Sequence, residues 1–357
     1  MRVIPDEIFQ NLLYLKLYDV TLIQNQSLRM LSSLRRLDIG YAAVADSELL
    51  NVLSQNAHSL EELSLNWLME AQQKPLFSSS PGPLLEKLKS FVTKGPLVFS
   101  LTGLQEIIGE GRQLRELKLQ SLSISSSQTW AQVLQNISNN SQPLMQMHSV
   151  GFGAATNCTD FWDSVAQFLN RCSGHLRVIS INGGPRGSNT RIPDTLRQSL
   201  LYDMARQPYL SDLILAWRND IGIDYDTVLS LRNLSTALDL LHLIMRFPPE
   251  NAVNHLLELI APFTSLRKLH LVFTRCSDDE DPDYYRYRSA HIHAGVEIGT
   301  RGRLWQEFVR KATILLPQLE EVSWSLFDRF MNLQRSFGTS MSVYQKVGFQ
   351  SIYAHTK

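Results

Sequence analysis

Aliphatic residues recur along the chain in the phrase Leu-x-x-Leu-x-Leu, with polar residues between them. The strict phrase starts at Leu12, Leu60, Leu114, Leu210, Leu238 and Leu266, and relaxed copies start at Leu34, Leu85, Leu144, Leu176 and Leu319. Successive side chains of a strand point to opposite faces, so alternating apolar positions fit a strand with one buried face. Each phrase therefore predicts a short strand.

Between the strand phrases, apolar residues follow the spacing of amphipathic helices. Leu49, Leu50 and Leu53 follow Asp46, a residue type that often caps a helix N-terminus. Ser127 precedes a similar pattern that includes Trp130, Val133, Leu134 and Ile137. The same spacing recurs in residues 160–172, 193–205, 249–260 and 303–315. The chain is thus predicted to alternate strand and helix.

The two residues inside the phrase are repeatedly charged, as in Ser33-Leu-Arg-Arg-Leu and Ser59-Leu-Glu-Glu-Leu. Successive phrases start 22 to 34 residues apart up to Leu266, and the last interval is 53 residues. These features resemble the leucine-rich-repeat family. The resemblance implies an α/β fold: a leucine-rich-repeat solenoid, or horseshoe, with a parallel inner sheet, outer helices and about ten to twelve irregular repeats.

The resemblance also implies a domain plan. Residues 1–326 are expected to form the solenoid, with loop insertions near 72–83 and 276–302. The aromatic-rich residues 327–357 are expected to form its C-terminal cap, because an open repeat end would expose apolar surface.

The repeat texture resembles that of divergent fungal arrays that often follow an F-box, but no F-box is recognisable. Ile4-Pro-Asp-Glu-Ile-Phe runs directly into the first strand phrase, without the polar cap that a repeat array needs. We therefore expect residues 1–357 to be the C-terminal part of a longer ancestral or mispredicted product. The resemblance implies a substrate-recognition component of a ubiquitin ligase. The alternative is a stand-alone regulatory or inhibitory binder, similar to the ribonuclease-inhibitor type.

Residues that flank the consensus leucines are expected on the concave face, where such proteins hold partners. The early rows, such as Tyr14, Lys16 and Tyr18, are largely polar, whereas later rows are more apolar. Exposed apolar and aromatic groups supply most interface hot spots. We therefore predict that a protein partner contacts Asp212, Ile214, Ala216, Trp217, Leu240, His242, Ile244, Lys268, His270 and Val272. In the alternative interpretation, a helix or loop covers these strands.

Composition narrows the partners further. Lys and Arg number 34 and Asp and Glu also number 34, so the positive excess typical of nucleic-acid binding is missing. No stretch approaches the roughly 20 apolar residues of a membrane span. The 3 cysteines have neither metal-ligand nor CxxC spacing, which favours a reducing compartment. We expect a monomeric cytoplasmic or nuclear protein.

Motifs that would carry chemistry are weak. Gly183-Gly-Pro-Arg-Gly-Ser-Asn-Thr lacks both the P-loop ending and the dinucleotide-binding spacing. His291 and His293 have no further ligand at convincing spacing. The acidic and tyrosine-rich residues 278–288 are interpreted as a solvated insertion or as a grip for a basic partner. We therefore expect no catalytic, cofactor or metal site, no small-molecule substrate and no enzymatic activity.

Overall fold

The computed structural model describes most of the phrase-bearing segments. It describes residues 11–18, 21–22, 31–68, 75–78, 83–109, 113–139, 144–154, 158–172, 174–183, 194–217, 237–246, 256–258, 260–274, 307–327, 340–344 and 353–354. For residues 21–22, 182–183, 194–198, 216–217, 244–246, 272–274, 323–327, 340–344 and 353–354 it describes the backbone alone. The chain forms two compact units, Met1–Asp203 and Met204–Lys357.

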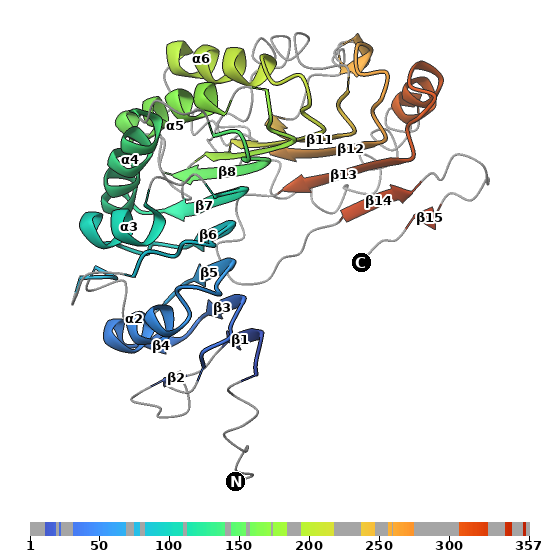
Figure 1. Ribbon diagram of the computed structural model, residues 1–357. Coiled ribbons are helices and arrows are strands. Elements are labelled where there is room, and N and C mark those ends of the chain that lie inside the picture. The colour runs from blue at the N-terminus through green and yellow to red at the C-terminus, as the bar shows by residue number, and fades with distance from the viewer. Residues whose placement is uncertain are drawn as a thin grey trace, which may run out of the picture. The chain divides into compact units, whose positions relative to one another are not determined.

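The first unit is built on a parallel sheet whose strands follow one another in sequence order (Figure 1). Its strands are β1 (Tyr14–Tyr18), β3 (Arg36–Gly40), β5 (Glu62–Asn66), β6 (Ser90–Lys94), β7 (Glu116–Leu122), β8 (Ser149–Ala154) and β9 (Val178–Gly183). A short parallel pair, β2 (Thr21–Leu22) with β4 (Ala43–Val44), lies outside this sheet. Strand order that follows the sequence is typical of a repeat array.

Strand register places the second phrase leucines side by side. Leu15 lies opposite Leu37 and Leu37 opposite Leu63, and the latter two are almost fully buried. The predicted period-two burial therefore holds: phrase residues enter the core and the residues between them face the other way.

The predicted starts of two relaxed phrases, Leu85 and Leu144, are wrong. Phe91, not Leu88, pairs with Leu63 on β5, and Val150 pairs with Leu117 on β7. The true phrases thus start three residues later, at Leu88 and at Met147. Leu85 and Leu144 are buried too, so the apolar pattern alone offered two starting points.

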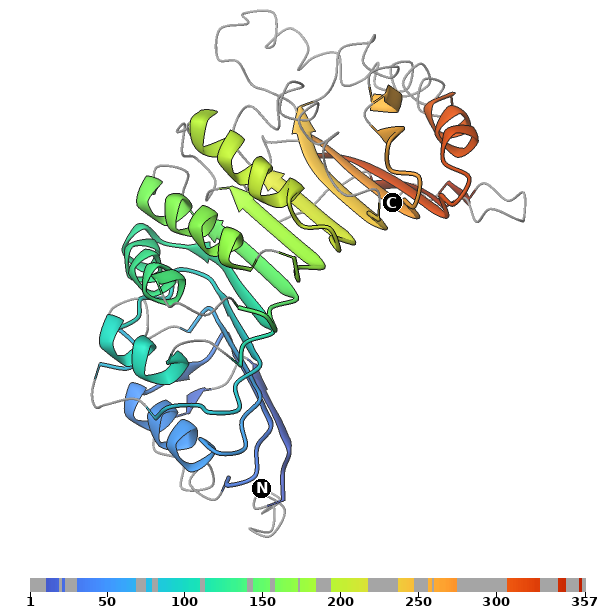
Figure 2. The ribbon, with the colours of Figure 1, turned by 45° about the horizontal axis from the view of Figure 1, so that its top comes forward.

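The described helices of the first unit lie on one face of its sheet (Figure 2). They are α2 (Asp46–Gln55), α3 (Leu101–Ile108), α4 (Ile124–Asn139), α5 (Thr159–Arg171) and α6 (Asp194–Ala205), which runs into the second unit. Each buries its apolar stripe against the strands; α5, for example, buries Phe161, Trp162, Val165, Phe168 and Leu169. The predicted alternation of strand and helix is confirmed for these segments.

Both predicted helix caps were wrong. Ala45 precedes α2, and the carboxylate of Asp46 instead accepts hydrogen bonds from the backbone N–H groups of Phe77 and Ser78, at 2.6 and 3.1 Å. Asp46 therefore ties residues 75–78 to the helix. At α4, Ser123 Oγ accepts from Ser126 N at 3.2 Å, so the helix begins one turn earlier than Ser127 indicated.

The core of the first unit is aromatic as well as aliphatic. Phe91 and Phe99 lie 5.5 and 5.9 Å from Trp130 between ring centroids, and Phe152 lies 5.9 Å from Phe168. Each of these rings is at most 2% exposed. Burying a side chain of this size contributes about 1.5–3 kcal/mol of gross transfer free energy, which no single strand-helix unit could gain alone.

The charged pair inside the phrase lies where each strand begins. Glu61 N and Glu62 N both donate to Arg35 O, and Lys89 N donates to Glu61 O. The same backbone ladder continues at Arg115 and His148. Side chains at these positions point toward solvent and pair between neighbouring strands, as Lys89 and Glu61 do at 2.6 Å. The recurrence of charge in the sequence thus has a local structural cause.

The second unit repeats the parallel arrangement. β10 (Asp212–Trp217), β11 (Leu240–Arg246), β12 (Lys268–Thr274) and β13 (Glu321–Phe327) pair in sequence order. Residues 307–315 are helical, within the predicted helix 303–315, whereas only 256–258 and 260 are described as helical within 249–260. The α/β class and the open parallel sheet are confirmed in both units; the horseshoe, the number of repeats and the leucine-rich type stay predictions.

Much of the predicted domain plan lies outside the described residues. Within the expected insertion 72–83, residues 75–78 and 83 are described, and Leu76 bridges to Phe99. Residues 276–302, with the acidic run and both histidines of the weak metal motif, and residues 184–190 of the glycine-rich motif lie outside. In the expected cap, β14 (Ser340–Tyr344) pairs antiparallel with β13, and β15 (Tyr353–Ala354) with β14.

Candidate functional site

The second unit aligns the predicted partner-binding residues in rows across its strands. Asp212 lies opposite Leu240, which lies opposite Lys268, and Ile214, His242 and His270 form the next row. All six residues are partly exposed, whereas the leucines between them are buried. We call these six residues the unit 2 face.

The remaining predicted residues extend the same strands. Ala216, Ile244 and Val272 are in register with one another, and Trp217 is the last residue of β10. The side chains of these four residues lie outside the described part of the chain. Their backbone register nevertheless fits a third row.

The centre of the unit 2 face is a histidine pair. The rings of His242 and His270 stack with centroids 5.8 Å apart and an interplanar angle of 15°. Burial lowers the pKa of His242, and the neighbouring His270 lowers it further. His270 Nε2 lies 3.5 Å from Glu321 Oε1, within ion-pairing distance when the histidine is protonated. At neutral pH His242 is therefore neutral and adds a flat, weakly polar surface beside Ile214.

An acidic residue borders this pair. Burial raises the pKa of the Asp212 carboxyl, and Asp239 raises it further while Lys268 opposes the rise. The unit 2 face thus combines two aliphatic side chains, two imidazoles and one residue of each charge. Such mixed surfaces suit protein recognition, because apolar area supplies affinity and placed charges supply selectivity.

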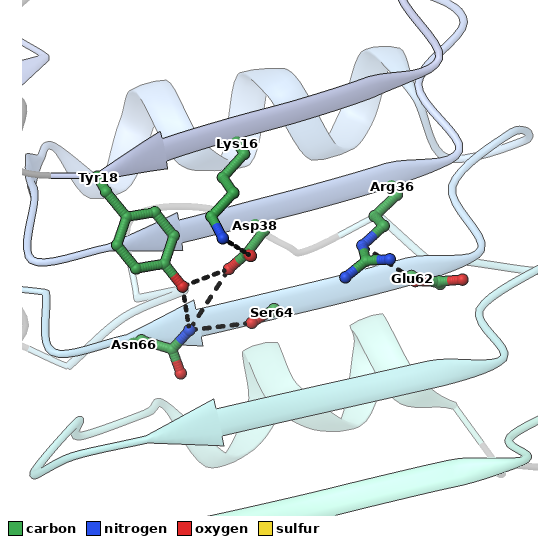
Figure 3. Close-up of polar contacts among 7 residues, drawn as sticks. All are labelled: Lys16, Tyr18, Arg36, Asp38, Glu62, Ser64 and Asn66. Atoms are coloured by element: carbon green, nitrogen blue, oxygen red, sulfur yellow. Dashed lines mark hydrogen bonds and ion pairs between the residues drawn. The ribbon is translucent and has the colours of Figure 1, made fainter.

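The first unit carries a different surface at the carboxyl ends of β1, β3 and β5. Tyr18 Oη donates a 3.0 Å hydrogen bond to Asp38 Oδ1, and Asn66 Nδ2 reaches Tyr18 Oη, Asp38 Oδ1 and Ser64 Oγ at 3.2, 3.4 and 3.0 Å (Figure 3). Lys16 Nζ lies 3.8 Å from Asp38 Oδ2. Burial and the bond to Asp38 raise the pKa of Tyr18. The network holds the Tyr18 ring in place.

Three aromatic rings continue from this network, and we call Tyr18, Tyr41 and Trp67 the aromatic shelf. Tyr41 lies 6.4 Å from Tyr18 and 6.5 Å from Trp67 between ring centroids, and the Tyr41 and Trp67 planes differ by 3°. Tyr41 is 46% exposed and the other two rings are partly exposed. The shelf is therefore an accessible aromatic surface with fixed geometry.

Tyr41 and Trp67 have positive φ angles of 50° and 49°. Each follows the last residue of its strand, and its N–H donates to the final carbonyl of the next strand, Asn66 O or Lys94 O. Gly95 occupies the same place after β6, and Ser121 occupies the equivalent register position at the irregularity within β7, with φ of 104° and 57°. A bulky side chain in this region is unusual, so the two aromatic residues occupy positions that favour glycine.

Sequence reasoning placed Tyr18 on the concave face but missed Tyr41 and Trp67. Both lie two residues beyond the last phrase residue, Ile39 or Leu65, and Trp217 has the same offset from Leu215. Aligning the phrases at that offset would have revealed the recurring aromatic residue.

No protein-family model matches the sequence, and no curated protein matches it significantly. None of the described helices is long and apolar enough to cross a membrane. The parallel sheet with helices is compatible with a leucine-rich-repeat-like solenoid.

Proposed function

We propose that this chain is a protein-interaction scaffold that binds a partner on the sheet face opposite its helices. The observation that carries the proposal is the register of the unit 2 face. Strands separated by about 28 residues in the sequence bring Ile214, His242 and His270 into one row. A row of partly exposed side chains on a hydrogen-bonded sheet is rigid, so little conformational entropy is lost when a partner binds.

The role proposed is a binding one and not a catalytic one. Within it, the resemblance to fungal F-box arrays favours substrate recognition for a ubiquitin ligase, and the alternative is a stand-alone regulatory or inhibitory binder. Both versions place the partner on the same face.

Proximity labelling with the intact chain, followed by mass spectrometry, tests the proposal. The informative variant is Ile214→Asp, which places a carboxylate in the middle of the unit 2 face. The matched control is Ile314→Asp on the helical residues 307–315, because Ile314 is 72% exposed and the chemical change is identical.

We expect specific neighbours that are labelled by the wild type and the Ile314→Asp variant and are lost with Ile214→Asp. Retention of every neighbour by a folded Ile214→Asp variant would contradict binding at this face. Cullin-ligase components among the lost neighbours would favour the ligase version, and their absence the stand-alone binder.

A further inference from the structure

We infer that the aromatic shelf of the first unit binds an extended, proline-containing segment of a partner protein. This inference rests on the proposed protein-binding function and adds a second site with a stated ligand chemistry. Four features of the shelf carry it: its exposed rings, their unusual backbone, the pairing of its charges and its unused hydrogen-bonding groups.

Tyr41 and Trp67 are held in a conformation that bulky residues rarely adopt. The backbone position itself requires no aromatic residue, because Gly95 and Ser121 occupy it further along the same sheet. Strained residues of this kind cluster at ligand sites, where the surrounding structure maintains them. The aromatic side chains therefore point to a role that the fold alone does not demand.

Glycines make room for the rings to lie against the backbone. A Cβ at Gly40 would come within 2.7 Å of the Tyr18 ring, and a Cβ at Gly95 within 2.9 Å of the Trp67 ring. Tyr18 and Trp67 thus rest on glycine backbone, which fixes the shelf before any ligand arrives.

The charges that β1, β3 and β5 place beside the shelf are already paired, whereas exposed Lys94 of β6, opposite Asn66, has no ion pair among the described residues. Lys16 pairs with Asp38, and Arg36 Nε lies 3.2 Å from Glu62 Oε2. Lys16 also lies over the Tyr18 ring, with Nζ 4.6 Å from its centroid. A cationic ligand would have to displace a cation that the chain itself supplies, and an anionic ligand would compete with Asp38 and Glu62. The complementary ligand is therefore uncharged where it meets Tyr18 and Tyr41.

Two polar groups at the shelf have no hydrogen-bond partner among the described residues. Trp67 Nε1–H is a donor, and Asn66 Oδ1, which points away from the network in Figure 3, is an acceptor. One donor and one acceptor beside flat rings suit a peptide: proline rings stack on the aromatic faces, and the backbone carbonyls of an extended segment accept from the indole N–H. Such a segment is already extended in solution, so it loses little entropy on binding.

The test is a fluorescence-anisotropy titration of the full chain with a fluorescein-labelled oligoproline of about ten residues. A glycine-serine peptide of equal length and a neutral glucan oligosaccharide serve as contrasting ligands. The variants are Tyr41→Gly and Trp67→Gly, and the matched control is Ser121→Gly, which makes the same backbone change where no ring is lost.

We expect the wild type and Ser121→Gly to bind oligoproline alike, and Tyr41→Gly and Trp67→Gly to bind about tenfold or more weakly. Trp67→Phe keeps an aromatic ring without the N–H and should bind about threefold more weakly. This variant still tests the role of Trp67 if Trp67→Gly folds poorly. Circular dichroism checks the fold of each variant.

Absence of oligoproline binding by the wild type, binding of the oligosaccharide instead, or equal weakening in Ser121→Gly would overturn the inference. The proposed function would survive that outcome, because its own test depends on Ile214 in the second unit.

Discussion

The two units present chemically different sheet faces on the same kind of parallel sheet. In the first unit, tyrosines, a tryptophan and paired charges gather at the carboxyl ends of the strands, and two of the rings occupy positive-φ positions. In the second unit, Ile214 and the His242–His270 pair lie in the middle of the strands. The comparison shows how a repeated backbone can carry two recognition surfaces, because core positions and face positions alternate and can vary independently.

The largest expected effect separates the two sides of one strand in the second unit. Leu213 is fully buried and Ile214 beside it is partly exposed. Leu213→Asp should lower the free energy of unfolding by about 4 kcal/mol or more, because it buries an unpaired carboxylate. Ile214→Asp should change it by about 1 kcal/mol or less. Urea denaturation followed by circular dichroism measures both, and equal losses would show that Ile214 belongs to the core.

A smaller effect tests the glycine support of the aromatic shelf. Gly95→Ala should lower the free energy of unfolding by about 1–3 kcal/mol, because φ of 104° disfavours a side chain and the new Cβ meets Trp67. Adding Trp67→Gly to this variant should restore the share of the unfolding free energy lost through the contact with the ring. The share lost through the positive φ angle should remain. If the double variant is as unstable as the sum of the two single variants, the contact between Gly95 and Trp67 contributes nothing.

The histidine pair should make the stability of the second unit depend on pH. The pKa of folded His242 is lowered from 6.5, so as pH falls below about 6.5 the unfolded chain takes up its proton first. Stability is therefore constant with respect to this group well above pH 6.5 and falls as the pH decreases through that value. The wild type should lose stability between pH 7.5 and 5.5 (roughly one unit on either side of the histidine pKa) relative to His242→Gln.

Thermal melts of both proteins at each pH measure that difference. The raised pKa of Asp212 has the opposite effect on stability, because folded Asp212 takes up a proton before the unfolded chain does as the pH falls. This contribution is present in both the wild type and His242→Gln. A wild type and a His242→Gln variant with parallel pH profiles would contradict the assignment to His242.

The smallest effect concerns exposed ion pairs, which both units contain. Arg36 and Glu62 in the first unit are about half exposed, as are Arg267 and Glu320 in the second, whose Nη2–Oε2 distance is 2.9 Å. Arg36→Met should change the free energy of unfolding by about 0.5 kcal/mol or less, and Arg267→Met, which removes a solvent-exposed guanidinium, should leave it essentially unchanged. Chemical denaturation at low and high salt measures the change, and a loss well above 1 kcal/mol would mean that the pair belongs to a larger network.

The periodic leucines of the sequence by themselves determine most of the architecture. Alternation within the phrase located most strands, including β9 and β13 from relaxed copies, and separated buried Leu213 and Leu215 from Ile214. The helical spacing located α2, α4, α5 and α6. Local periodicity is sufficient here because each strand and each helix packs mainly on the elements that adjoin it in sequence. Burial therefore follows the short-range pattern.

Tertiary structure decided what short-range pattern leaves open. Strand pairing places Phe91 and Val150, and not Leu88 and Met147, opposite the core leucines of the preceding strands. The sequence pattern allowed both registers, because register depends on the neighbouring strands. The tertiary structure directed the carboxylate of Asp46, the first residue of α2, to the backbone N–H groups of Phe77 and Ser78, so Asp46 does not cap the helix. It also gathered Tyr18, Tyr41 and Trp67, which lie more than 20 residues apart in sequence, through adjacent strand ends and positive φ angles that the sequence pattern does not encode.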